Sequence, residues 1–125
     1  MDEIRVLTPN GMLGYGFPVK WFKRALSMNP HVIAVDSGST DSGPHKLATG
    51  VMTCSRAAYT KDISLLLDAV NEKKIPLFIT SAGGAGTNDQ VDIFLDIIRA
   101  ISEERGYHFR IAAIYSEINK EIIKK

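Results

Sequence analysis

The 125-residue sequence has little cysteine, little net charge and no long apolar run. Its single cysteine, Cys54, can form neither an internal disulfide nor, alone, a zinc site. A formal net charge of +1 gives no electrostatic footprint for nucleic acid or for an anionic membrane. No apolar run approaches the roughly 20 residues of a membrane span, and the first residues show no basic-then-apolar signal layout. We therefore expect a cytoplasmic protein with no nucleic-acid or membrane partner.

The residues that are present predict an α/β fold in one domain covering 1–125. Hydrophobic residues make up 45% and charged residues 23%, which is an ordinary globular composition. The expected strands are "IRVLTP", "HVIAVD", "IPLFITS" and "YHFRIAAIYSE", and helical spacing recurs in "PVKWFKRALSM", "AAYTKDISLLLDAVNEKK", "TNDQVDIFLDIIRAISEERG" and "INKEIIKK". These strands are apolar without alternation, which is typical of strands buried on both faces. The order βαβαβαβ(α) therefore predicts a Rossmann-like three-layer sandwich with a mostly parallel sheet of about four strands.

A sheet of four parallel strands leaves an uncovered edge, and the chain stops about two turns into its last expected helix. Native proteins protect such edges, because unpaired backbone groups invite pairing with another chain. We therefore expect a homo-oligomer, a companion subunit, or a further C-terminal region of a longer protein to cover this edge.

The loops that follow the strands carry the candidate binding residues. Loops of this kind emerge at the carboxyl edge of a parallel sheet, where α/β proteins bind ligands. Here they are "TPNGMLGYGF", "DSGSTDSGPHKLATG", "TSAGGAGTND" and "YSEIN", and most are rich in glycine. We expect a small anionic or polar metabolite to bind where they meet. The candidate ligand-binding residues are Asn10, Gly11, Gly14, Ser39, Thr40, Arg56, Ser81, Gly83, Gly84, Gly86 and Thr87.

The second loop contains the candidate catalytic residues Asp36 and Asp41. Asp36 ends a strand inside the expected crevice, a usual place for a functional carboxylate. Together with the loop hydroxyls, the two carboxylates could hold a divalent cation such as magnesium. They could equally bind substrate hydroxyls, or act as an acid–base pair if burial shifts one pKa. The structural alternative is that they close Asx-type turns or cap a helix.

The third loop, "SAGGAGTND", joins a strand to the clearest helix. Its glycines and the helix N-terminus are suited to a phosphate or carboxylate. The loop lacks the Lys-Ser/Thr of a Walker loop and the spacing of GxGxxG. The alternative is a tight turn that needs positive φ, capped by Thr87 or Asn88. In the first loop, ligand binding by Asn10 and its neighbouring glycines competes in the same way with a flexible loop.

Other polar residues near these loops are weaker candidates. Arg56 could clamp an anion at the start of a helix. Cys54 could be an activated nucleophile, but a small half-buried residue is the simpler interpretation. His45 is a possible acid–base group, and Glu117 could add a carboxylate to the crevice.

Five segments in order across nearly the whole chain resemble the N-terminal part of the acyclic terpene utilisation family, the AtuA-like proteins. These segments are "VLTPNGMLGYGFP", "VIAVDSGSTDSGPHKLATG", "SRAAYTKDISLLL", "IPLFITSAGGAGT" and "IAAIYSEINKE", with Ser37 and Ser42 where relatives have alanine and proline. The resemblance implies an α/β domain of a longer enzyme of small organic acid or acyclic terpenoid (acyl-CoA-type) catabolism. It supplies no catalytic residues to carry over. The rival hypothesis is a non-catalytic binding or assembly module, or a truncated member that needs a partner chain.

Overall fold

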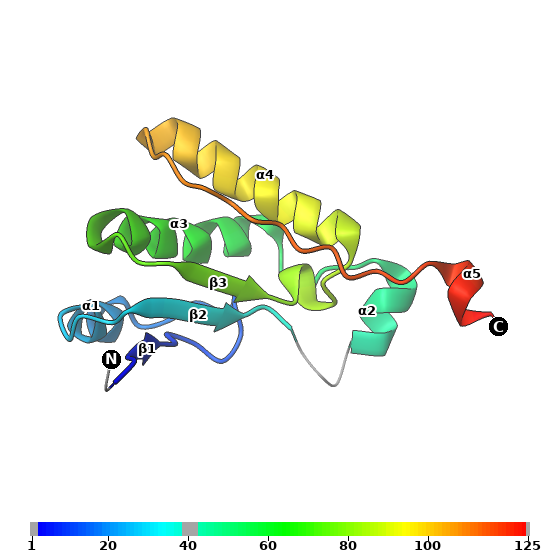
Figure 1. The fold of residues 1–125 in the computed structure, drawn as a ribbon, viewed down its shortest axis with the longest axis horizontal. Coiled ribbons are helices and arrows are strands. Elements are labelled where there is room, and N and C mark those ends of the chain that lie inside the picture. Colours follow the sequence, from blue (N-terminus) through cyan, green and yellow to red (C-terminus); the bar gives the residue numbers. More distant parts are fainter. Residues whose placement is uncertain (1–2, 39–42, 125) are drawn as a thin grey trace.

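The computed structural model describes residues 3–38 and 43–124, and it is an α/β fold built on a small parallel sheet (Figure 1). The strands are β1 (Val6–Leu7), β2 (Val32–Asp36) and β3 (Leu77–Thr80). The helices are α1 (Val19–Leu26), α2 (Gly43–Thr49), α3 (Arg56–Lys73), the 3-10 turn η1 (Ala82–Gly84), α4 (Asn88–Arg105) and α5 (Lys120–Ile123). None of the helices in the described ranges is long and apolar enough to cross a membrane.

The described part of the chain forms a three-stranded sheet in the order β1-β2-β3, with all pairs parallel. Ile33 of β2 lies opposite Leu7 on one side and Leu77 on the other. The expected fourth strand is wrong, because residues 107–116 are extended but form no ladder with β3. Side-chain hydrogen bonds tie this segment to the helices instead: Tyr107 donates to Asp68 of α3, and Tyr115 donates to Asp92 of α4.

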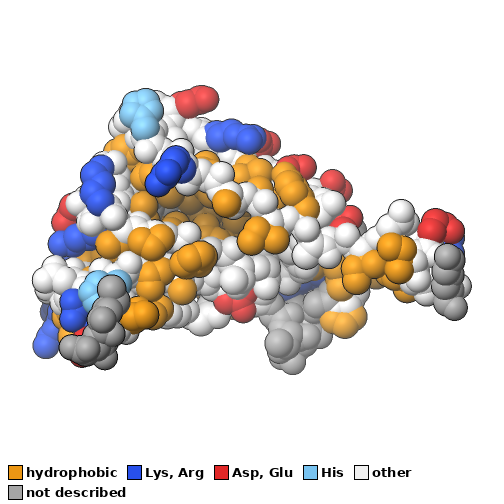
Figure 2. All heavy atoms as spheres, in the orientation of Figure 1, with side chains coloured by type: hydrophobic (Ala, Val, Ile, Leu, Met, Phe, Trp, Pro, Cys, Tyr) orange, Lys and Arg blue, Asp and Glu red, His pale blue; other side chains and the backbone are white. Residues whose placement is uncertain are grey.

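Helices cover one face of this sheet. Ile33 and Val35 of β2 are buried in a single core with side chains of α1, α3 and α4. The side chains that alternate with these along the strands point to the other face of the sheet and are exposed to solvent. Val6 is 57% exposed and Phe78 is 60% exposed. The third layer expected from the sequence is therefore missing from the described residues. Strands that are adjacent in both sequence and space, joined by right-handed crossovers, place their connecting helices on the same side. Figure 2 shows hydrophobic side chains gathered over the strands on the exposed face of the molecule.

The two long helices follow the sequence pattern closely. In α3 the expected apolar stripe is buried, and its N-cap Ser55 accepts a hydrogen bond from the amide of Ala58. α4 begins after its N-cap Thr87 and ends at Gly106, which adopts the left-handed conformation (φ 66°) that favours glycine at a helix end. Both caps satisfy backbone groups that a helix terminus leaves unpaired.

One helix was missed. Residues 43–49 were expected to be loop, but they form α2. Proline in the first turn lacks only an N–H that would be unpaired there, so "GPHKLAT" is compatible with a helix start at this point. Lys46 and His45 therefore lie on a helix and not in a loop.

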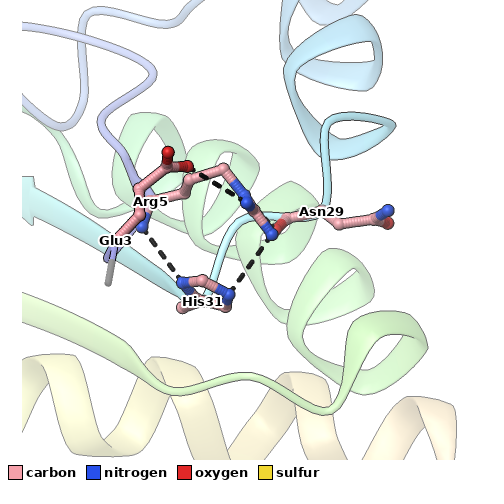
Figure 3. Close-up of polar contacts among 4 residues, drawn as sticks. All are labelled: Glu3, Arg5, Asn29 and His31. Carbon is pink, nitrogen blue, oxygen red and sulfur yellow. Dashed lines mark hydrogen bonds and ion pairs between the residues drawn. The ribbon is translucent and has the colours of Figure 1, made fainter. Parts of the chain in front are cut away.

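At the opposite, amino-terminal end of the sheet, four residues connect β1 to the chain before β2 (Figure 3). The side chain of Arg5 donates to the carbonyl oxygen of Asn29 (3.0 Å) and to Glu3 (3.1 Å), and its backbone amide donates to Nδ1 of His31 (3.1 Å). His31 therefore has a structural role, because it joins β1 to the chain segment before β2.

Candidate functional site

The loops that follow the three strands meet at the carboxyl edge of the sheet. The amide of Leu13, in the first loop, donates to the carbonyl oxygen of Asp36 (2.7 Å). The amide of Ser37 donates to the carbonyl oxygen of Thr80 (3.0 Å), which joins the second loop to the third. The segment before α3 is tied in as well, through a bond of 2.8 Å from the amide of Thr53 to the carbonyl oxygen of Gly83. Chain segments far apart in sequence therefore form one continuous surface.

Asp36 ends β2, as expected, and its carboxylate hydrogen-bonds to residues of the second loop and of β3. Its Oδ1 accepts hydrogen bonds from the amide of Gly38 (2.8 Å) and from the hydroxyl of Thr80 (2.9 Å). The first of these closes an Asx turn, which was the structural alternative. Burial acts to raise the pKa of Asp36, but hydrogen bonds from Gly38, Thr80 and Ser81 outweigh it, so the pKa lies below its ordinary value. Asp36 is therefore a carboxylate at neutral pH, suited to accept hydrogen bonds or a cation and not to donate a proton.

Two glycine amides of the first loop are occupied within the protein. The backbone N–H groups of Gly14 and Gly16 both donate to Oδ2 of Asp62, at 2.8 and 2.9 Å. Asp62 lies on α3 and is only 1% exposed. Asn10 donates to the carbonyl oxygen of Met12 (3.0 Å). The conformation of this loop therefore depends on a buried carboxylate that the sequence analysis missed. The sequence did indicate it, because Asp62 is a lone aspartate on an otherwise apolar helix face.

The third loop is a tight turn. Ser81, Gly83, Gly84 and Gly86 all have positive φ. The amides of Gly84 and Gly86 donate inside the turn, to Ser81 (2.9 Å) and Ala82 (3.0 Å), so they are not free for an anion. A Cβ at Gly84 would lie only 2.2 Å from Oγ1 of Thr53, which allows no side chain at this position. Glycine is required here by both conformation and close packing.

The N-terminus of α4 holds an anion from the chain itself. The hydroxyl of Thr87 accepts from the amide of Gln90 (3.3 Å), and the amide of Asn88 donates to the carboxylate of Glu117 (2.8 Å). Thr87 is therefore a cap, as the structural alternative proposed. Glu117 does reach the region of the crevice, where it occupies the helix end that was predicted for a ligand.

A cluster of buried polar side chains lies behind the third loop, and we call Ser37, Lys46, Thr53 and Tyr59 the polar cluster. Ser37 and Tyr59 are fully buried, and Lys46 is only 7% exposed. Nζ of Lys46 lies 3.4 Å from the position that a Cβ on Gly84 would take. The hydroxyls of Ser37 and Thr53 make no hydrogen bond of good geometry within the described residues.

Tyr59 lies at the centre of this cluster. Its hydroxyl accepts from the amide of Cys54 (3.3 Å). Burial raises the pKa of Tyr59, and the neighbouring hydroxyls of Ser37 and Thr53 only partly offset it. Tyr59 is thus a neutral phenol, able to donate a hydrogen bond. Sequence reasoning placed Lys46 in a loop and Tyr59 on an ordinary helix face, so it missed both.

Cys54 does not have the properties of an activated nucleophile. Burial raises the pKa of its thiol, and this outweighs the lowering effects of Tyr59 and Lys46. A neutral thiol is a poor nucleophile and a poor metal ligand. The simpler interpretation, a small half-buried residue, fits the structure, in which Cys54 packs where a Cβ on Gly14 would lie.

The remaining candidates are distributed around the edge. Arg56 begins α3 and is exposed, as is His45 on α2. Gly11 is exposed, with open space around the position of a Cβ. Ser39, Thr40 and Asp41 lie outside the described residues, so the proposed pairing of Asp36 with Asp41 stays a prediction. Within the ranges 3–38 and 43–124, no group of three His, Cys, Asp or Glu residues is placed to hold a metal ion.

Two open cavities lie away from the polar cluster. One of about 370 Å³ is lined by Arg99, Ser102, Glu103, Gly106, Tyr107, His108, Phe109 and Ile111, and one of about 190 Å³ by Leu7, Thr8, Pro9, Pro18, Trp21, Phe22 and Ala25. Neither brings a carboxylate together with buried, unpaired donors. The converging loops therefore have the stronger chemical case for a binding site.

Comparison with protein-family models, with curated proteins and with solved structures found no match to this chain.

Proposed function

We propose that this chain is an AtuA-like domain that binds a small polar or anionic metabolite at the carboxyl edge of its sheet. In this proposal it belongs to a cytoplasmic enzyme of small organic acid or acyclic terpenoid (acyl-CoA-type) catabolism. The observation that carries the proposal is the contact between the loops after β1, β2 and β3, with the carboxylate of Asp36 between them. Parallel α/β sheets bind ligands at this edge.

The chemistry of the edge favours a ligand that presents a hydroxyl group or a bound cation to Asp36. Asp36 accepts hydrogen bonds through an ionised carboxylate, which is complementary to a ligand hydroxyl or to a cation. A divalent cation held by Asp36 needs further oxygen ligands, and Asp41 is the nearest acidic candidate in sequence. The lowered pKa of Asp36 makes it a weak base, so its role in this proposal is to orient the ligand.

A titration followed by amide NMR tests this function. The chain is titrated with short carboxylic acids, hydroxy acids and acyl-CoA thioesters, and the amides of Gly38 and Ser81 report binding. Asp36→Asn keeps the shape of the side chain but removes its charge, so we expect at least about tenfold weaker binding. Asp96→Asn, an exposed change on α4, is the matched control and should bind normally. Binding that is equal in Asp36→Asn, or that shifts amides elsewhere, contradicts the proposal.

The second candidate function is a binding or assembly module whose chemistry is supplied by a partner chain. The open apolar face of the sheet favours it, since Phe78 and Val6 are more than half exposed. Exposed apolar surface of this kind marks association sites on globular proteins. Such a module would associate without needing the charge of Asp36.

A further inference from the structure

We propose that the groove between α1 and the end of β1 binds an acidic segment of a partner protein. One large apolar side chain of that segment fills the groove, and its carboxylates pair with Lys20 and Arg24. This inference goes beyond the proposed function, because it concerns a protein partner and involves neither Asp36 nor a metabolite. The groove is lined by Leu7, Thr8, Pro9, Pro18, Trp21, Phe22 and Ala25.

The groove is apolar and has room for one large side chain. Thr8 is the one polar residue that lines it, and Phe22 and Leu7 connect it to the core. Its volume is about 190 Å³, and an apolar cavity of roughly 150 Å³ is enough to hold a benzene molecule. The groove is therefore suited to a single phenylalanine or leucine side chain of a partner.

Trp21 lines the groove and is 57% exposed. Tryptophan is highly buried on average, and tryptophan and arginine are enriched among the residues that contribute most to binding at protein interfaces. A rigid aromatic side chain offers a large contact area at a low cost in conformational entropy. An exposed indole beside an apolar groove therefore favours an interface with another protein.

Two cations lie over the ring of Trp21. Nζ of Lys20 and Cζ of Arg24 are each 5.6 Å from the centroid of the ring. The attraction between a cation and an aromatic face is about 0.5–1 kcal/mol at exposed sites, so it restricts where these long side chains lie. Neither cation forms an ion pair within the ranges 3–38 and 43–124. Both are therefore placed to meet carboxylates of a partner beside the groove.

The charge of this region selects an acidic partner. Residues 4–35 contain no aspartate or glutamate, and α1 also carries Lys23. Complementary charges across an interface speed association and oppose partners of like charge. The formal net charge of the whole chain is only +1, so this attraction is local. It matches a short acidic peptide segment better than a nucleic acid, whose binding needs contacts with many phosphates.

The test uses the blocked peptide Asp-Glu-Phe-Asp-Glu as the probe. The readout is the fluorescence of Trp21, the single tryptophan of the chain. We expect a saturable change that weakens as salt is added, because salt screens exposed charges. The peptide Asp-Glu-Ala-Asp-Glu lacks the side chain for the groove, and Asn-Gln-Phe-Asn-Gln lacks the carboxylates. Each should bind at least about tenfold more weakly than the probe.

Two pairs of substitutions separate this site from general charge attraction. Lys20→Gln combined with Arg24→Gln should weaken binding of the probe about tenfold. Lys61→Gln combined with Arg110→Gln removes the same charge at exposed positions elsewhere and should leave binding unchanged. Ala25→Leu reduces the space in the groove at constant charge and should also weaken binding. Circular dichroism identifies the variants that keep the fold.

Several outcomes would overturn the inference. They are equal affinity in the two charge variants, equal affinity of the phenylalanine and alanine peptides, and no change in fluorescence up to about 1 mM probe. Tighter binding to phosphatidylserine vesicles or to polyuridylate than to the probe would overturn it as well, because the basic surface would then face a membrane or RNA. The probe is detected at Trp21 and metabolites at Gly38, so this inference and the proposed function can fail separately.

Discussion

At the scale of single residues, Asp62 is the side chain on which the first loop depends most. Its carboxylate is buried and accepts the amides of Gly14 and Gly16. Asp62→Ala leaves two amides without their partner, at about 1–3 kcal/mol for each buried donor. We therefore expect the free energy of unfolding to fall by about 2–5 kcal/mol, measured by urea denaturation.

Two comparisons show whether this loss comes from the amides. Asp62→Asn keeps one acceptor oxygen and should lose less stability than Asp62→Ala. Asp96→Ala removes an exposed ion pair with Arg99 and should change the free energy of unfolding by less than about 1 kcal/mol. If Asp62→Ala is as mild as Asp96→Ala, the first loop does not depend on this carboxylate.

Asp36 adds a pH dependence at the same scale. Because its pKa is below the ordinary value of 3.8, the folded state binds fewer protons than the unfolded state in this range. Its stabilising contribution is complete above the unfolded pKa and is lost as the pH falls through the folded pKa. Asp36→Asn should therefore flatten the acid side of the stability curve, measured by urea unfolding between about pH 3 and about pH 5. A carboxyl carbon titration with its midpoint at or above 3.8 would contradict this prediction.

At the scale of elements, local signals predicted the helices well and the sheet less well. The periodic apolar residues, Thr87 and Gly106 marked the limits of α4 correctly, because caps act through bonds within a few residues. The segment 107–116 has the composition of a strand, but a strand also needs a partner edge. Here Tyr107 and Tyr115 donate hydrogen bonds to carboxylates on the two long helices. Local strand propensity cannot predict such contacts between residues far apart in sequence.

The candidate site shows the same division. The position of Asp36 was predicted correctly because it ends a strand, and α/β proteins commonly bind ligands at the carboxyl ends of parallel strands. Lys46 and Tyr59 were missed because their significance comes from burial beside a turn that is distant in sequence. The glycines of the first loop were expected either to bind a ligand or to lie in a flexible loop, whereas the amides of two of them donate to Asp62 across the fold. Spacing alone cannot show such pairings.

At the scale of the whole molecule, the sheet has one covered and one open face. The open face carries Val6 and Phe78, and the segment 107–116 adds further exposed apolar side chains, including Ile114 at 83% exposure. Monomeric proteins rarely leave such surfaces contiguous and open. A second copy of the chain, packed through the sheet face, would bury the same residues on both sides of a two-fold interface.

The last prediction is therefore that the chain self-associates through the open sheet face. Phe78→Glu places a charge in the middle of that face, and burying an unpaired charge opposes association. We expect sedimentation equilibrium to show a dissociation constant at least about tenfold weaker than that of the wild type, with the monomer still folded. Ile114→Glu changes an apolar residue of the segment 107–116 and should have little effect. If Ile114→Glu dissociates the chain and Phe78→Glu does not, that segment and not the sheet face forms the interface, because only a residue inside the buried surface can exert this penalty.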